Sequence, residues 1–253
     1  MFNFNLPSSS EQGKPMRLKC ITCEALTRLV YLCAAESKHK IDITLVKIGL
    51  HDTPKELRRR LQNEIDTAPE NGYDAVLLAY GLCGKATDGL VAKEIQLVIP
   101  RAHDCITLFL GSRQRYNKQF DQCPGTYWYV LDYLERRDAD STVLSLGSGS
   151  IDFDIHSKYE EYVQKYGKDN ADYLLETMGA WTQHYTRAVF LDMGLGYIDE
   201  LEAKTIEQAQ QRGWTYERMA GNMVLIRRLL NGDWENDFLV VPPGNQIRMT
   251  GAG

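Results

Sequence analysis

Three cysteines, Cys23, Cys83 and Cys105, have the residue type and the positions that metal chemistry requires. Each lies at or just past the end of a short apolar run, in the segments LKCITCEAL (18–26), AYGLCGKATDGL (79–90) and IPRAHDCITLFLGS (99–112). Thiolates are the soft ligands that zinc and iron–sulfur clusters prefer. Three sulfurs leave one position of a tetrahedral zinc, or one iron of a four-iron cluster, open to a substrate. The pattern predicts a metal–thiolate site, with zinc and an iron–sulfur cluster left as alternatives.

The residues beside these cysteines suit such a site. Gly81 and Gly84 let the backbone approach a bulky group, so we expect them to bind the cofactor. Cys105 is expected to begin a helix, where backbone N–H groups and the helix dipole favour the thiolate. His103 is either a fourth ligand or an acid–base group, and Arg101 is suited to an anionic substrate. We therefore expect His103 and Arg101 to be the catalytic residues.

The remaining cysteines are expected to be packing residues, because a cysteine in an apolar segment most often behaves as a small buried hydrophobe. This interpretation covers Cys20, Cys33 and Cys123. Cys20 and Cys23 also spell CxxC, which leaves a redox pair as an alternative. A redox CxxC usually opens a helix, whereas this one lies across a strand end.

The elements that must position these residues follow an alternation of apolar and amphipathic segments. We expect strands at 17–23, 41–50, 73–81 and 95–100, with helices at 24–37, 52–66 and 103–120, the last broken at Gly111. This β-α-β-α-β pattern is typical of an open, largely parallel sheet. Ligands of such sheets gather outside the carboxyl ends of the strands. If the cysteine-bearing strands are neighbours about 4.8 Å apart, their loops share one coordination sphere.

The strand–helix alternation resumes after a polar, helical stretch, which predicts a second unit. We expect an α/β fold with two Rossmann-like lobes, mainly parallel sheets and a cleft at the C-terminal strand ends. The expected organisation is a flexible lead-in over 1–15, a first lobe over 16–134 that carries the cysteine motifs, a helical crossover over 135–185, and a second lobe over 186–253.

Composition limits the functional classes. The chain has 253 residues, 43% hydrophobic and 25% charged, with a net charge of −5, so no basic surface suggests nucleic-acid binding. No apolar run reaches the roughly 20 residues of a membrane span, and the first residues do not resemble a signal peptide. Six cysteines without secretory features do not indicate a disulfide framework. We expect a cytoplasmic protein that binds neither nucleic acid nor membrane.

Several motifs together resemble a known family. The segments TCEAL, YDAVLLAYGLCG, LVIPRAHDCITLFLGSR, PGTYW, LLNGDW and FLVVPPG are similar to those of the bacterial and archaeal family called domain of unknown function 1638, from about Met16 to Gln246. YGLCG and RAHDC are the most specific of them. The resemblance implies that motif positions fall on Cys23, Cys83, His103 and Cys105. It implies no reaction.

The sequence supports three functional hypotheses. The first is a metal–thiolate enzyme for sulfur or alkyl transfer on a small molecule, either anionic or thiol-containing. The second is an accessory protein that binds a metal, a metalloid or a corrinoid without turnover. The third is a metal-free enzyme with Cys105 as nucleophile and His103 as base. We rank it last, because two residues separated by a single residue at a helix start rarely point at each other.

Overall fold

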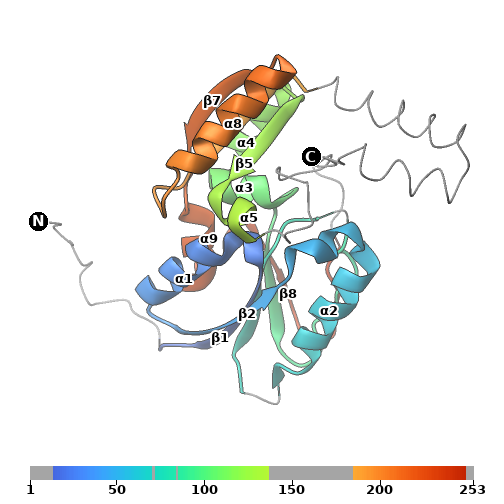
Figure 1. Cartoon of the computed structure of the whole chain (residues 1–253). Coiled ribbons are helices and arrows are strands. Elements are labelled where there is room, and N and C mark those ends of the chain that lie inside the picture. The colour runs from blue at the N-terminus through green and yellow to red at the C-terminus, as the bar shows by residue number, and fades with distance from the viewer. Residues whose placement is uncertain (1–13, 70–71, 84, 137–184, 249–253) are drawn as a thin grey trace, which may run out of the picture.

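The computed structural model describes residues 14–69, 72–83, 85–136 and 185–248, which form a mixed α/β fold with two sheets (Figure 1). The lead-in up to residue 13, residue 84 and nearly all of the expected crossover lie outside the described residues. One sheet is mostly parallel and the other is entirely parallel. The α/β class and the parallel pairing expected from the sequence are confirmed.

The larger sheet has five strands in the order β2-β1-β3-β4-β8. Their bounds are β1 (Arg17–Cys23), β2 (Lys40–Val46), β3 (Ala75–Ala79), β4 (Gln96–Pro100) and β8 (Phe238–Val241). The first four strands are parallel, and β8 is antiparallel to β4. All five residues of β3 are buried, as expected for a central strand covered on both faces.

Helices cover both faces of this sheet. The helices α1 (Thr27–Glu36) and α9 (Val224–Asn231) lie on one face, and α2 (Pro54–Asp66) lies on the other (Figure 1). Pro54 occupies the first turn of α2, where a missing N–H costs nothing. The buried residues of α2 recur every four positions, at Leu57, Leu61 and Ile65. Its opposite side is rich in arginine, which is the amphipathic pattern of a helix lying on a sheet.

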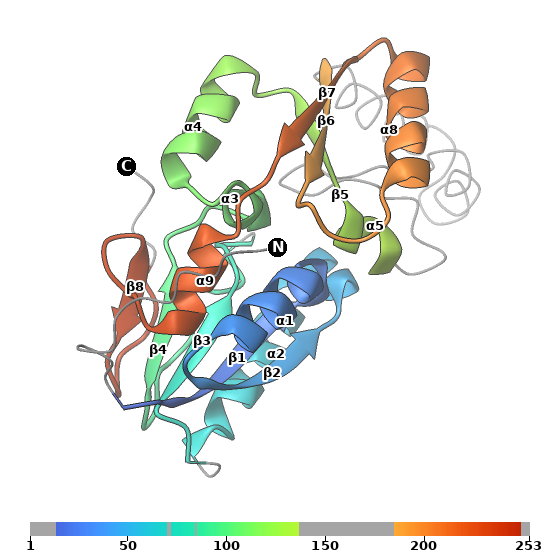
Figure 2. The same cartoon turned by 90° about the vertical axis from the view of Figure 1, so that its left-hand side faces the viewer.

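The smaller sheet has three parallel strands in the order β5-β6-β7. Its strands are β5 (Thr126–Val130), β6 (Arg187–Asp192) and β7 (Thr215–Ala220), and its helices are α5 (Leu131–Arg136) and α8 (Asp199–Arg212). Figure 2 shows α8 running along β6 and β7. Tyr127 and Tyr129 belong to a small apolar cluster of this sheet, whereas Trp128 and Val130 join the main core. This alternation is the two-residue period of a strand, and it makes one face of the sheet part of the main core.

Two 3-10 helices, η1 (Glu24–Leu26) and η2 (Ile48–Asp52), follow β1 and β2, and two helices, α3 (Cys105–Leu110) and α4 (Arg113–Gln122), connect β4 to the smaller sheet. The helix break expected at Gly111 is confirmed, because Gly111 ends α3 with φ of 70°. Gly111 also has no room for a side chain, since a Cβ atom there would lie 2.8 Å from Asn222. The N–H of Asn222 donates to the carbonyl of Phe109 at 2.8 Å, which ties α3 to the segment between β7 and α9.

The sheets do not follow the boundaries expected at residues 134 and 186. β5 lies in the expected first lobe but pairs with β6, and β8 lies in the expected second lobe but pairs with β4. The helix α9 accounts for the position of β8 in the larger sheet. Its buried side chains pack against β3 and β4, which brings the chain back to that sheet just before β8. An apolar stripe of this kind must be buried, and the larger sheet offers the surface for it.

Candidate functional site

The three predicted metal ligands come together at one edge of the larger sheet. Cys23 is the last residue of β1, Cys83 lies in the loop after β3, and Cys105 is the first residue of α3 after β4. The order β1-β3-β4 makes these strands neighbours, so the adjacency on which the prediction depended is confirmed. Cys23 contributes to the raised pKa of Cys83, and Cys83 and Cys23 both contribute to the raised pKa of Cys105. They therefore lie within electrostatic range of one another.

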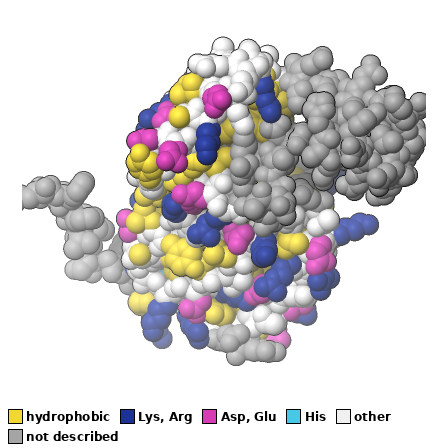
Figure 3. All heavy atoms as spheres, viewed as in Figure 1, with side chains coloured by type: hydrophobic (Ala, Val, Ile, Leu, Met, Phe, Trp, Pro, Cys, Tyr) yellow, Lys and Arg dark blue, Asp and Glu magenta, His cyan; other side chains and the backbone are white. Residues whose placement is uncertain are grey.

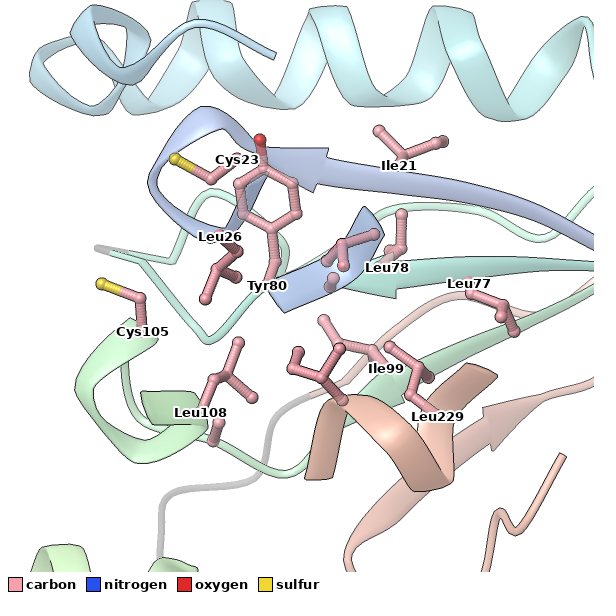
Figure 4. Close-up of a cluster of buried hydrophobic side chains, with 14 of the residues drawn as sticks. Ile21, Cys23, Leu26, Leu77, Leu78, Tyr80, Ile99, Cys105, Leu108 and Leu229 are labelled. Atoms are coloured by element: carbon pink, nitrogen blue, oxygen red, sulfur yellow. The ribbon is translucent and has the colours of Figure 1, made fainter. Parts of the chain in front are cut away.

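The view along the strand ends shows how two of these thiols are oriented. The sulfurs of Cys23 and Cys105 project to the same side, beyond the end of β1, and the Tyr80 ring lies beside Cys23 (Figure 4). Tyr80 is buried. Burial, followed by Cys23 and Cys83, raises the pKa of its hydroxyl well above the ordinary value. Tyr80 is therefore a neutral, poorly solvated neighbour of the thiols.

Burial decides the protonation state of the thiols. Burial is the first cause of the raised pKa in all three thiols, and it raises the pKa of Cys23 to about 12. Backbone N–H groups oppose the rise without reversing it; that of Ala25 donates to Cys23 Sγ at 3.5 Å. Cys105 was expected to be a thiolate at a helix start. That expectation is corrected, because burial and the Asp104 carboxylate outweigh the N–H groups of a helix only six residues long.

Asp104 organises the polar side of the site, and the sequence prediction missed it. Its Oδ1 accepts from the N–H of Ile106 at 3.0 Å and of Thr107 at 3.4 Å, which caps α3. Its Oδ2 accepts from the Tyr116 hydroxyl at 2.9 Å and lies 3.2 Å from His103 Nδ1. An acidic residue directly before an apolar helix is a signal for a cap. The contact with Tyr116 gives no sequence signal, because it depends on how α4 folds back after Gly111.

His103 is held by Asp104 and remains open to solvent. Its side chain is 48% exposed, and its ring is stacked with that of Tyr116 at a centroid distance of 5.7 Å. The hydrogen bond to Asp104 is the first cause that raises the pKa of His103. A carboxylate beside Nδ1 favours the tautomer with hydrogen on that atom, and this leaves Nε2 as the position for proton exchange. Asp104 thus orients a solvent-accessible imidazole at this end of the sheet.

The two glycines of the Cys83 loop have different outcomes. Gly84 lies outside the described residues. A Cβ atom on Gly81 would lie 2.6 Å from the Cα of Asp104, so the next loop already occupies the space that a side chain needs. The N–H of Leu82 donates to the carbonyl of Ala102 at 2.9 Å. Gly81 therefore allows the loops after β3 and β4 to touch, rather than opening space for a cofactor.

Arg101 is placed by β8. It is exposed, its Nε donates to the carbonyl of Phe238 at 3.2 Å, and its N–H donates to the carbonyl of Asp237 at 2.7 Å. These bonds fasten the end of β4 to the start of β8. They give Arg101 a structural role that the sequence did not indicate.

The other three cysteines lie in different parts of the fold. Cys20 and Cys23 both belong to β1, where residues three apart point to opposite faces. The CxxC therefore does not bring two thiols together as a redox pair. Cys33 is buried in α1. Cys123 is partly exposed before β5. Although burial acts to raise its pKa, hydrogen bonds from Thr186 and Thr126 lower it below the ordinary value.

The three thiols do not form a preassembled metal site. Among the described residues, no group of three or more His, Cys, Asp or Glu side chains is arranged to hold a metal ion. The thiols are neighbours, but they do not have coordination geometry.

Among the residues that the structure describes, no helix has the length and apolar character needed to cross a membrane. On the face drawn in Figure 3, positive and negative side chains are interspersed.

Comparison with known proteins gives a family and no further relative. Neither the curated proteins nor the solved structures gave a match. The family model described as "Protein of unknown function (DUF1638)" matches residues 45–230. This range includes Cys83, His103 and Cys105 and leaves out Cys23. Because the match covers well over half of the sequence, the chain belongs to the DUF1638 family.

Proposed function

We propose that this protein is a metal–thiolate enzyme in which Cys23, Cys83 and Cys105 take up a soft ion, either zinc or an iron–sulfur cluster. The observation that carries the proposal is the convergence of three thiols on neighbouring strand ends of one parallel sheet. Strand ends of this kind are where α/β proteins bind ligands. A soft ion is the ligand class that several sulfurs at one point select.

The protonation state of the thiols gives the proposal a chemical consequence. All three have raised pKa values, so a metal must displace protons when it binds, and its affinity should increase with pH. Each sulfur also faces a backbone N–H, from Ala25, from Gly81 and from Cys105 itself. Such N–H groups stabilise a thiolate once it has formed.

Uptake requires local movement, because the side chains are not already in coordination geometry. The side chain of Cys83 is the natural group to reorient. It lies in a loop rather than in a regular element, and its φ is 44°, a left-handed conformation that is uncommon for a residue with a side chain. Backbone strain of this kind is typical of functional loops.

The histidine favours an enzyme over a carrier. His103 is oriented by Asp104 through Nδ1, and its side chain is about half exposed, so we propose that it gives or takes a proton on a substrate. A protein that only carries a metal has no need of an oriented acid–base group. The bound metal would supply Lewis-acid chemistry or hold a substrate sulfur or oxygen. We propose a small anionic or thiol-containing substrate, bound in a cleft between the two sheets, and sulfur or alkyl transfer as the reaction.

The geometry also ranks the alternatives. A metal-free Cys105 nucleophile is disfavoured, because its pKa is raised and because His103 bonds to Asp104 rather than to the thiol. An accessory protein that binds a metal, a metalloid or a corrinoid without turnover shares the thiol site. The enzyme and the accessory protein differ in one respect: the enzyme converts a substrate with the help of His103, and the accessory protein has no turnover.

The first test is the metal content of protein purified without oxygen. We expect zinc or an iron–sulfur cluster in wild type, and its loss in the Cys23→Ser, Cys83→Ser and Cys105→Ser variants. Cys33→Ser is the matched control, since this buried thiol belongs to α1 and not to the strand ends, and it should retain the metal. Equal metal in all four variants would contradict the proposal.

The second test separates the enzyme from the accessory protein. The metal-loaded wild type and His103→Gln are compared for transfer to a panel of small thiols and anionic acceptors. We expect the variant to keep its metal and lose turnover. Turnover that is unchanged in His103→Gln would remove the acid–base role, and metal binding without turnover in wild type would favour the accessory protein.

A further inference from the structure

The loop that carries Cys83 is held in an unfavourable backbone conformation. Cys83 and Lys85 have φ values of 44° and 67°, in the left-handed region that costs a residue with a Cβ about 1 kcal/mol. Two such residues in one short loop persist only if the surroundings hold them there. The groups that hold this loop therefore set the position of the Cys83 sulfur.

An arginine from another element is one of the groups that hold this loop. Arg58 of α2 donates from Nη2 to the carbonyl of Lys85 at 2.6 Å and from Nε to the carbonyl of Ala86 at 3.3 Å. A planar guanidinium with several fixed donors is suited to hold two successive carbonyls. The two bonds fix the peptide groups directly after the strained segment.

The neighbouring arginines show that this contact is specific. Arg59 pairs with Glu56, and Arg60 pairs with Glu64, both within α2 itself. Arg58 has no ion pair among the described residues. In a run of three arginines, only Arg58 reaches from the helix to the loop.

One turn along the same helix, a second side chain fixes the far end of the loop. Gln62 accepts from the N–H of Val91 at 2.9 Å and donates to the carbonyl of Val91 at 3.1 Å. Residues four apart lie on the same side of a helix, so Arg58 and Gln62 form one bracket. The buried side of α2 fastens this bracket to the larger sheet. Because α2 is packed on the sheet, its bonds through Arg58 and Gln62 hold the loop in a fixed position relative to the sheet.

We infer that Arg58 is a positioning residue for the metal site, which places Cys83 opposite Cys23 and Cys105 without touching the ion. The inference rests on the proposed function, since it assigns Arg58 to the same thiol site. It also makes a separate claim about the free protein: Arg58 limits the exposure of the Cys83 sulfur, whether or not a metal binds.

The test compares Arg58→Gln and Arg58→Lys with the matched control Arg59→Gln, which changes an exposed arginine of the same helix. Cadmium ion is the probe, because the sulfur-to-cadmium absorbance reports how many thiolates bind each ion. We expect three thiolates in wild type and in Arg59→Gln. Arg58→Gln should bind through two, with affinity lower by about tenfold, the size of effect typical of residues that orient ligands. Arg58→Lys keeps one donor and should fall between them.

A second readout does not depend on metal. The rate at which maleimide modifies Cys83, followed by peptide mapping, should rise about tenfold in Arg58→Gln, as expected when a held group is released. It should stay unchanged in Arg59→Gln. Thermal unfolding of each variant ensures that only folded protein is compared.

The outcomes separate the two claims. If wild type does not bind cadmium through three sulfurs, the proposed function fails, and the maleimide rates alone decide the role of Arg58. If wild type does bind in this way, a count of three in Arg58→Gln overturns the inference. A count of zero overturns it too, because nothing links Arg58 to Cys23 and Cys105. Equal maleimide rates in Arg58→Gln and wild type also count against it.

Discussion

The carboxyl ends of the two sheets carry different chemistry. In the larger sheet they carry Cys23, Cys83 and Cys105, whereas in the smaller sheet they carry carboxylates, with Asp192 ending β6 and Asp132 following β5. Both carboxylates have arginine partners: Arg218 lies 2.7 Å from Asp192, and Arg28 lies 3.1 Å from Asp132.

The electrostatic surroundings of the two edges also differ. Among the described residues, the pKa values of the three thiols are raised by burial and by negative or sulfur-bearing neighbours, and no cation contributes. At the smaller sheet, the hydrogen bond from Arg218 and the N–H of Gly194 lower the pKa of Asp192. The charges of the smaller sheet are thus balanced by protein groups. The thiols are instead held neutral by burial, and this contrast is why we propose a function for the larger sheet.

The largest effect expected from this comparison is on thiol reactivity. A pKa of about 12 for Cys23, against a lowered pKa for Cys123, makes the thiolate of Cys23 roughly 1000-fold rarer at pH 8. Iodoacetamide should therefore modify Cys123 first in metal-free protein. The rate at Cys23 should rise as the pH approaches 12, which mass spectrometry of the peptides can follow. Similar rates at Cys123 and Cys83 would show that the strand ends are not buried as described.

The next effect concerns the glycines that follow the strands. Gly81→Ala would place a Cβ 2.6 Å from the backbone of Asp104, whereas a Cβ at Gly221 would mainly meet the flexible Met193 side chain, with the carbonyl oxygen of Phe109 at 3.0 Å. Backbone yields less readily than a methionine, so we expect a loss of about 3 kcal/mol at Gly81 and about 1 kcal/mol at Gly221. Urea denaturation measures both. An equal loss would mean that the loops after β3 and β4 are not in close contact.

A smaller loss is expected from the ion pair that joins the sheets. Asp132 is 2% exposed, and it accepts from the N–H of Arg28 at 2.7 Å in addition to pairing with its side chain. Asp132→Ala should cost about 2 kcal/mol, since it leaves the donors of Arg28 without their acceptor while that side chain keeps some solvent contact. Asp121→Ala, on the exposed side of α4, is the control and should leave the free energy of unfolding unchanged.

The smallest effect is a pH dependence at Asp192. Its folded-state pKa lies below the ordinary value of 3.8, so its contribution is complete above that pH and is lost as the pH falls through the lowered value. For a pair near the surface we expect about 0.5 kcal/mol. Asp192→Asn should remove this part of the acid loss, as urea denaturation between pH 3 and 6 would show. An acid limb identical to that of wild type would mean that Asp192 is not held by Arg218 in solution.

Local patterns determined much of what the sequence predicted correctly. The apolar run of β3, the proline at the start of α2 and the break at Gly111 follow from periodicity and backbone chemistry, which neighbouring residues are sufficient to specify. The family motifs also gave the correct family. The return of β8 to the larger sheet was missed, because strand pairing between distant segments leaves no local signal.

The sequence by itself therefore determined the elements, their parallel arrangement and the presence of cysteines at strand ends. Only the tertiary structure decided that β1, β3 and β4 are neighbours, that Asp104 joins His103 to Tyr116, and that Arg58 reaches the Cys83 loop. It also reversed the expected acidity of Cys105, because a pKa depends on all the charges and solvent around a group and not on its place in a helix. Residue types fix what chemistry is available, and burial and contact between distant segments fix which of it is used.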